Sequence, residues 1–192
     1  MAGLVLLTAP TERVVSVDEL RVHARTENAN EDDLLETLID AATEQAEAFC
    51  RRRFVTQTWR ATFDGFPAGA ILLPRPPLVS VSHLRYLDTA GIEQTLSSTL
   101  YSVKTGAAPG RIVQAYGTCW PIARNEEDSV RVQYVCGYGA AADVPAGIRQ
   151  AVLLIAATLY TNRETVAPVA MQPIPHSAEW LLGRYRVVRQ AA

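Results

Sequence analysis

Apolar and polar residues follow a helical period in the first part of the chain. Ser16 followed by Glu19 is a capping-box pattern, which predicts a short helix ending near His23. Asn30 is the expected N-cap of a longer helix over Asp32–Phe49, whose first turn carries acidic residues that the helix dipole favours. One face of this longer helix is apolar at helical spacing. That face consists of Leu34, Leu35, Leu38, Ile39, Ala42, Ala46 and Phe49.

The opposite face of the longer helix is predicted to be acidic. Three arginines, Arg51–Arg53, follow the helix at the end where its dipole favours cations. Because this run closes a strongly acidic helix, it indicates a dipole contact rather than a nucleic-acid patch. The acidic positions of the outer face are Glu36, Asp40, Glu44 and Glu47.

Between Phe54 and Gly139 the pattern changes to short alternating apolar runs. This zone holds 10 of the 14 aromatic residues and 8 of the 11 glycines, which favours strands separated by turns. Turns are predicted at Asp88–Gly91 and Pro109–Gly110, and the prolines within 74–77 suit a sheet edge or a crossover. We expect a compact antiparallel β unit. Its predicted strands are Val55–Phe63, Ala70–Leu73, Val79–Asp88, Ile92–Leu96, Leu100–Val103, Arg111–Tyr116 and Ser129–Cys136.

The last part of the chain returns to a helical pattern. Pro145 suits a first helical turn, and the helix that follows to about Asn162 is apolar around nearly its whole circumference, so it should be central. A short helix over Ser177–Leu182 is stopped by Gly183. The tail over Arg184–Arg189 alternates basic or aromatic with apolar residues, which is typical of a frayed end or of a segment that meets a partner.

These zones predict an α+β fold, in which N- and C-terminal helices form a bundle with a β-rich antiparallel insertion between them. A length of 192 residues is typical of one domain, so the chain is expected to be a single unit. Its 48% hydrophobic and 20% charged residues argue against disorder. The expected divisions are N-terminal helices at 16–53, the insertion at 54–143, C-terminal helices at 144–182 and the tail at 183–192.

The net charge of −2 conceals an uneven distribution along the sequence. Between Asp18 and Glu47, ten acidic residues stand against Arg21 and Arg25, which gives this segment −8 and leaves +6 for the rest. The division predicts an electrically two-sided surface.

The cysteines and the apolar runs indicate a protein of a reducing compartment without membrane association. Cys50, Cys119 and Cys136 form no close pair and are expected to be free thiols. The apolar run Leu4–Leu7 is too short for a secretory signal and has no basic residue before it. Ala151–Tyr160 reaches about half of a membrane span, so a buried helix is predicted there.

No catalytic, metal-binding or cofactor-binding residue is predicted. His23, His83 and His176 lie far apart, and none stands at metal-ligand spacing to a cysteine or another histidine. The acidic run Glu126–Asp128 has the charge for a divalent ion, but a solvated loop is favoured. The turn Gly137–Ala142 fits the opening of a dinucleotide site, yet no second βαβ unit follows, so a strand-to-helix turn is favoured.

A further indication comes from the order of several stretches along nearly the whole chain. These stretches are SVDELRVHAR from Ser16, DDLLETLIDAATEQAEAF from Asp32, WRATFDGFP from Trp59, ILLPRPPL from Ile71, LRYLDTAG from Leu84, LYSV from Leu100, GRIV from Gly110, the pair Trp120–Pro121, VRVQYVCGYG from Val130, VPAGIRQAVLLIAATLYTNRE from Val144 and LLGRYRVVR from Leu181. In this order the sequence resembles the head-to-tail connector (adaptor, or head-completion) family of tailed bacteriophages, also present in phage-like gene transfer agents. The long β zone departs from short members of that family.

The resemblance implies a virion structural protein without catalysis or a cofactor, made in the bacterial cytoplasm and placed in the particle neck. Such proteins form a ring, expected to be dodecameric, that docks under the portal protein and continues the DNA channel. Double-stranded DNA passes through transiently and without specific binding, and stopper or tail proteins attach to the ring. By the resemblance, the residues that reach toward the portal are Arg184, Tyr185, Arg186, Val187, Val188 and Arg189.

The acidic helix suits such a role, because a DNA passage must not hold phosphates with basic residues. We hypothesise that Glu36, Asp40, Glu44 and Glu47 face the lumen or a neighbouring subunit. Two other classes stay open. A small nucleotide-binding enzyme would use the Gly137–Ala142 turn, and a DNA-binding packaging factor should carry a basic helix.

Overall fold

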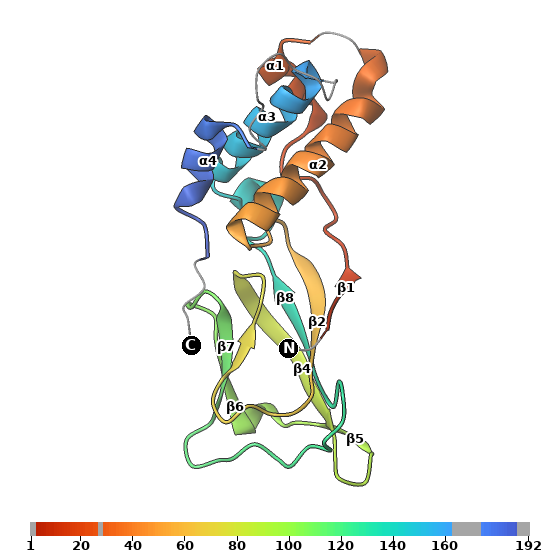
Figure 1. The fold of residues 1–192 in the computed structure, drawn as a ribbon, viewed down its shortest axis with the longest axis vertical. Coiled ribbons are helices and arrows are strands. Elements are labelled where there is room, and N and C mark those ends of the chain that lie inside the picture. The colour runs from red at the N-terminus through yellow and green to blue at the C-terminus, as the bar shows by residue number, and fades with distance from the viewer. Residues whose placement is uncertain (1–2, 27–28, 163–173, 188–192) are drawn as a thin grey trace. The chain divides into compact units, whose positions relative to one another are not determined.

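The structure is a computed structural model that describes residues 3–26, 29–162 and 174–187 (Figure 1). The chain divides into two compact units, which we call the β unit and the helical unit. The β unit is formed by Met1–Pro10 and Thr56–Tyr138, and the helical unit by Thr11–Val55 and Gly139–Ala192. The chain therefore passes between the units three times. In the described ranges no helix is long and apolar enough to cross a membrane.

The helical unit is built around α3, which spans Ala146–Thr161. This helix packs against α1, α2 and α4, which confirms the prediction of a central helix. Ile148, Val152 and Ile155 on α3 are fully buried, as their spacing on one face requires. The other elements of this unit are α1 (Val17–Ala24), η1 (Ala29–Glu31), α2 (Asp32–Cys50), η3 (Ala141–Asp143) and α4 (His176–Gly183).

The starts of the first two α-helices differ in how far local sequence determines them. At α1 the predicted capping box is confirmed, because Glu19 N donates to Ser16 Oγ (3.1 Å) and Ser16 N donates to Glu19 Oε2 (2.8 Å). At α2 the predicted N-cap Asn30 is wrong. The helix begins at Asp32 after the 3₁₀ turn η1, and its N-cap residue Glu31 makes no side-chain cap hydrogen bond.

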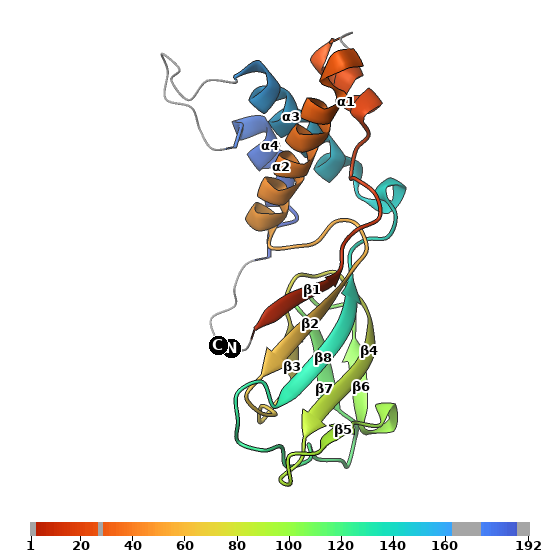
Figure 2. The ribbon, with the colours of Figure 1, turned by 90° about the vertical axis from the view of Figure 1, so that its right-hand side faces the viewer.

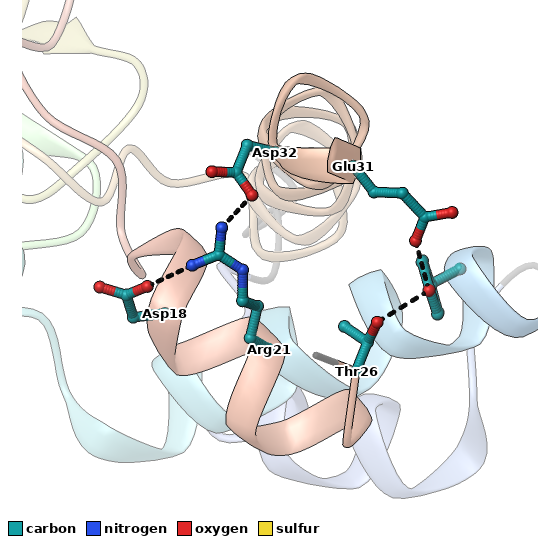
Figure 3. A network of polar contacts seen from close by, with 6 residues as sticks. Asp18, Arg21, Thr26, Glu31 and Asp32 are labelled. Carbon is teal, nitrogen blue, oxygen red and sulfur yellow. Dashed lines mark hydrogen bonds and ion pairs between the residues drawn. The ribbon is translucent and has the colours of Figure 1, made fainter. Parts of the chain in front are cut away.

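Tertiary contacts fix the start of α2 instead (Figure 3). The Tyr160 hydroxyl on α3 donates to Glu31 Oε2 (2.6 Å) and lies 3.2 Å from Thr26 Oγ1. Arg21 on α1 bridges Asp18 and Asp32. Tyr160 is 129 residues from Glu31 and Arg21 is 11 residues from Asp32, which is why a local capping rule does not find these two contacts.

The β unit contains two antiparallel sheets that enclose one core (Figure 2). The five-stranded sheet has the order β1-β2-β8-β4-β5, and the three-stranded sheet has the order β3-β7-β6. Trp59, Leu84 and Tyr134 from the larger sheet and Ile71 and Ile112 from the smaller one are buried in the core. The strands are β1 (Leu4–Thr8), β2 (Gln57–Phe63), β3 (Ile71–Leu73), β4 (Leu78–Leu87), β5 (Glu93–Thr95), β6 (Tyr101–Lys104), β7 (Gly110–Gln114) and β8 (Val130–Cys136).

All seven predicted strands are present, with ends that differ by one or two residues. The turn after β4 is also confirmed, because Asp88 accepts hydrogen bonds from Gln94, Ile92 N and Ala90 N, which together lower the pKa of its carboxyl. The prolines within 74–77 lie on the crossover from β3 in one sheet to β4 in the other. The strand β1 was not predicted, since the sequence shows there only a short apolar run.

The end of α2 is held by a buried charge. Glu47 is 8% exposed, accepts a hydrogen bond from Phe54 N (2.8 Å) through Oε1 and pairs through Oε2 with Arg53. The expectation that Glu47 shares the outer acidic face is therefore wrong. Arg51 ends the helix with a left-handed φ of 55°, which turns the chain back so that residues 53 and 54 reach the carboxylate.

Replacing Glu47 by alanine should lower the free energy of unfolding by about 3 kcal/mol, because Arg53 and the Phe54 N–H lose a buried anionic partner. Urea unfolding of the full chain, followed by circular dichroism, measures the change. Glu44→Ala is the matched control, since Glu44 is exposed on the same helix and should change stability by no more than about 0.5 kcal/mol. Equal stabilities for the two variants would contradict this account.

Candidate interaction site

The exposed face of α2 carries acidic residues, and one arginine from the segment before α1 contacts them. Arg13 donates from Nε to Asp40 Oδ1 (2.8 Å) and lies 3.3 Å from Glu36 Oε2. The hydrogen bond to Asp40 is the main cause of a raised Arg13 pKa. Glu44 is exposed and has no ion pair within the described ranges. The structure thus places three of the four predicted acidic residues on this face, with two of them partly neutralised.

Other acidic residues of the N-terminal segment are paired within the helical unit. Arg149 on α3 pairs with Glu19, and Arg21 pairs with Asp32. The helical unit holds 14 acidic and 11 basic residues, and the β unit holds 6 acidic and 7 basic residues. Arginines from distant segments fold against the acidic segment, so the helical unit carries a net −3 and the β unit a net +1, and the two-sided surface expected from the sequence stays a prediction.

The C-terminal segment returns to the end of α2. Val187 N donates to Cys50 O (3.0 Å), and Arg52 Nε donates to Tyr185 O (2.5 Å). The Tyr185 ring packs beside Gly147 at the start of α3, where a Cβ atom would lie 3.3 Å from the Tyr185 hydroxyl. Residues 184–187 are thus fastened to the helical unit. Of the predicted portal-binding residues, Val188 and Arg189 lie outside the described residues.

Four arginines gather around the end of α2 and form what we call the basic cluster. Arg184 and Arg186 are exposed, and the Arg186 guanidinium lies 5.0 Å from the Phe49 ring centroid. Trp180, one helical turn before Arg184, is 81% exposed. At about 1.5 Å per residue, the 19 residues of α2 separate this cluster from the acidic start of the helix by about 28 Å. The basic cluster consists of Arg51, Arg52, Arg184 and Arg186.

Sequence reasoning singled out the tail arginines and the Arg51–Arg53 run separately. Nothing in the sequence indicated that they converge, because the convergence depends on the hydrogen bonds between residues 50–52 and 185–187. Arg53 does not join the cluster, since it pairs with Glu47.

The glycine-rich turn after β8 holds carboxylates of the protein itself. Ala140 N donates to Asp143 Oδ2 (2.9 Å), and Ala141 N donates to Glu12 Oε1 (2.8 Å). A Cβ atom at Gly139, which has a φ of 137°, would lie 2.3 Å from Asp143 Oδ2. These N–H groups are the donors that a phosphate would need. The interpretation as a strand-to-helix turn is confirmed, and the turn leads into the short η3.

The remaining candidate groups are the acidic loop and the cysteines. Within the described ranges, no group of three or more histidine, cysteine, aspartate or glutamate residues could hold a metal ion. Glu126 of the acidic loop pairs with Arg124 (3.0 Å). Cys50, Cys119 and Cys136 are free thiols, and burial raises the pKa of Cys50 to about 11, which keeps that thiol protonated and unreactive near neutral pH.

The chain was compared with known protein families. Residues 14–99 match the family described as "Phage gp6-like head-tail connector protein". This range covers α1, α2 and the strands β2 to β5. No curated protein matches the chain.

Solved structures match over nearly the full length. A chain in the virion of a native gene transfer agent particle has 26% identity and a TM-score of 0.81, covering 98% of this chain and 97% of that chain. A chain in the neck of the native particle, computed with C12 symmetry, gives the same values. A chain in the neck of an empty particle, computed with C6 symmetry, has 27% identity and a TM-score of 0.79 with the same coverage.

Proposed function

We propose that this chain, which belongs to the phage gp6-like head-tail connector family, is a ring-forming adaptor in the neck of a tailed particle. It docks under the portal protein, continues the DNA channel and offers stopper or tail proteins a surface for attachment. The chain is a structural component and not an enzyme, as the family match indicates.

The observation that carries this proposal is the full-length similarity to chains of gene transfer agent necks. Because 98% of this chain and 97% of that chain align at a TM-score of 0.81, both units are shared and not only a common helical motif. The necks that contain the similar chains were computed with C12 and C6 symmetry. A ring of twelve copies follows for this chain if it occupies the same place, since rotational symmetry places identical copies around one axis.

The C-terminal segment is the proposed contact to the portal. Arg184 and Arg186 are exposed at the basic cluster, and the hydrogen bond from Val187 N to Cys50 O fixes where the chain leaves the helical unit. A fixed exit point gives the following residues, Val188 and Arg189, a defined origin for contact with another protein. Arginine is suited to such a contact because its planar guanidinium binds carboxylates with two parallel hydrogen bonds.

The acidic face of α2 is the proposed lining of the lumen or of a subunit contact. A lumen lined by Glu36, Asp40 and Glu44 would repel DNA phosphates and let the duplex pass, because phosphate binding needs basic side chains. Glu47 has no part in this face, since it is buried. The partial neutralisation by Arg13 leaves Glu44 as the most strongly uncompensated of the three.

The first prediction from the proposed function concerns the place of the protein in the particle. Deletion of its gene should leave DNA-filled heads without tails, because the tail has no surface on which to attach. Cryo-electron microscopy of particles from cells that carry the wild-type gene should show a collar of this chain between head and tail. Tailed particles from the deletion strain would contradict the proposed function.

The second prediction concerns the tail. Removal of residues after Val187, combined with Arg184→Glu and Arg186→Glu, should weaken binding to portal-containing heads by at least about tenfold, because charge-assisted contacts are lost. Truncation after Val187 keeps the hydrogen bonds that hold residues 185 and 187. Co-purification with heads measures the effect. Lys104→Glu, a change of the same sign in the β unit, is the control; unchanged co-purification of the tail variant would refute the tail contact.

The third prediction concerns the acidic face. Replacing Glu36 and Glu44 by glutamine and Asp40 by asparagine should impair ring assembly or DNA passage, because the surface loses three charges and Arg13 loses its partners. Infectivity or gene-transfer titre measures the result. Glu127→Gln, on an exposed loop of the β unit, serves as control. A wild-type titre for the triple variant would remove this face from the proposed channel and interface.

A further inference from the structure

The strand β1 forms one edge of the five-stranded sheet among the described residues. Among the described residues it pairs only with β2, so the alternate backbone N–H and C=O groups on its other side meet no described strand. Its side chains are aliphatic, with Val5 50%, Leu6 41% and Leu7 37% exposed. Native edge strands are usually blunted by charges, proline, β-bulges or shortness, and of these β1 has one register shift, between Leu6 and Thr8. The sequence LVLLT of β1 has neither a charge nor a proline over five residues, which is typical of a strand that pairs with another chain.

The opposite edge of the same sheet is only partly covered. The strand β5 pairs with Arg85–Leu87 at the end of β4, and its Glu93 forms ion pairs with Arg85 and Arg131. The earlier part of β4, Leu78–His83, has β8 on one side and no described strand on the other. Val79, for example, is 50% exposed. No Asp, Glu, Lys or Arg occurs in this open segment of β4.

The directions of the strands decide how two such edges would meet. Because β1, β2, β8 and β4 are antiparallel at each step, β1 and β4 run in opposite directions. Rotation about a ring axis leaves the direction of a strand along that axis unchanged. When one copy is brought beside the next in this way, β1 of the first lies antiparallel to β4 of the second, so the alternation continues across the junction.

We propose that β1 of one copy pairs with the open segment Leu78–His83 of β4 in the next copy, so that the five-stranded sheets join around the ring. The inference rests on the proposed ring, and it names the contact that builds it. The partner of each open edge is a second copy of this chain, because every copy carries both β1 and the open segment of β4. The two halves of the contact are different surfaces, as a closed ring requires, neither carries Asp, Glu, Lys or Arg, and they have similar lengths of five and six residues.

Disulfide cross-linking tests the pairing in assembled necks. Val5→Cys is combined with Ser80→Cys or with Ser82→Cys, both exposed on β4, in a Cys119→Ser background that removes the exposed native thiol. Facing residues of an antiparallel pair have Cβ atoms about 4.5–5.5 Å apart, close to the range a disulfide accepts. Oxidation of particles should then give a ladder of dimers, trimers and larger multiples. The controls are Val5→Cys alone and Val5→Cys with Thr89→Cys at the exposed hairpin tip.

The possible results separate this inference from the proposed function. A ladder from the β1–β4 variants alone supports the pairing. Intact necks that contain the chain but give no cross-link with either β4 position overturn the inference and leave the proposed function standing. Dimers from Val5→Cys alone overturn it too, because they show that β1 meets β1. Necks that lack the chain overturn both.

A second variant tests the same edge without cysteine. Val5→Lys with Leu7→Lys places two charges on β1 and should reduce the amount of the chain in necks at least fivefold. Val5→Thr with Leu7→Thr is the matched control, since threonine is uncharged and favours strands. Urea unfolding of the isolated chain verifies that both variants fold. Wild-type incorporation of a folded lysine variant would overturn the pairing.

Discussion

The helical unit depends on one buried carboxylate at the end of α2. Glu47 sits where the helix dipole disfavours an anion, so it requires Arg53 and the Phe54 N–H as partners. These partners turn the chain immediately after Cys50, whose carbonyl then accepts the hydrogen bond from Val187 N. The partners of this single carboxylate thus determine where the chain leaves α2. The hydrogen bond that holds the C-terminal segment lies beside this exit, and the two together bring the arginines of the basic cluster close to one another.

The three passages of the chain between the units are joined on the helical side by one side-chain hydrogen bond and one backbone bridge. Glu12, just after the first passage, accepts a hydrogen bond from Ala141 N, just after the third. Val55, just before the second, forms a parallel bridge with Gly139. The glycine-rich turn Gly137–Ala142, which fits the sequence pattern of a dinucleotide site, therefore connects the chain segments that pass between the units. Its glycines give the backbone the positive φ values that the turn needs, and two carboxylates occupy its donors.

Features with a local cause were predictable from the sequence, and features with a distant partner were not. The capping box at Ser16 and the period of α2 and α3 need only neighbouring residues, and strand alternation located seven of the strands. Asn30 failed as a cap because Tyr160 and Arg21 determine the approach to Asp32. The burial of Glu47 and the convergence of the arginines depend on residues far along the chain. For the same reason β1, whose place at the sheet edge is set by pairing with β2, gave only an apolar run.

The two units offer a ring two physically different kinds of contact. The helical unit carries its charges at separated ends of α2, so contacts through it should weaken as salt screens them, with a Debye length of about 8 Å at physiological ionic strength. The β unit has nearly balanced charge, and its open edges, aliphatic in β1 and mixed with serine and histidine in β4, carry no Asp, Glu, Lys or Arg. Contacts through those edges use backbone hydrogen bonds and apolar burial, which salt screens little. In the proposed ring, the sheet junctions would persist while the charged contacts are exchanged, which would suit the proposed adaptor, on which other proteins dock.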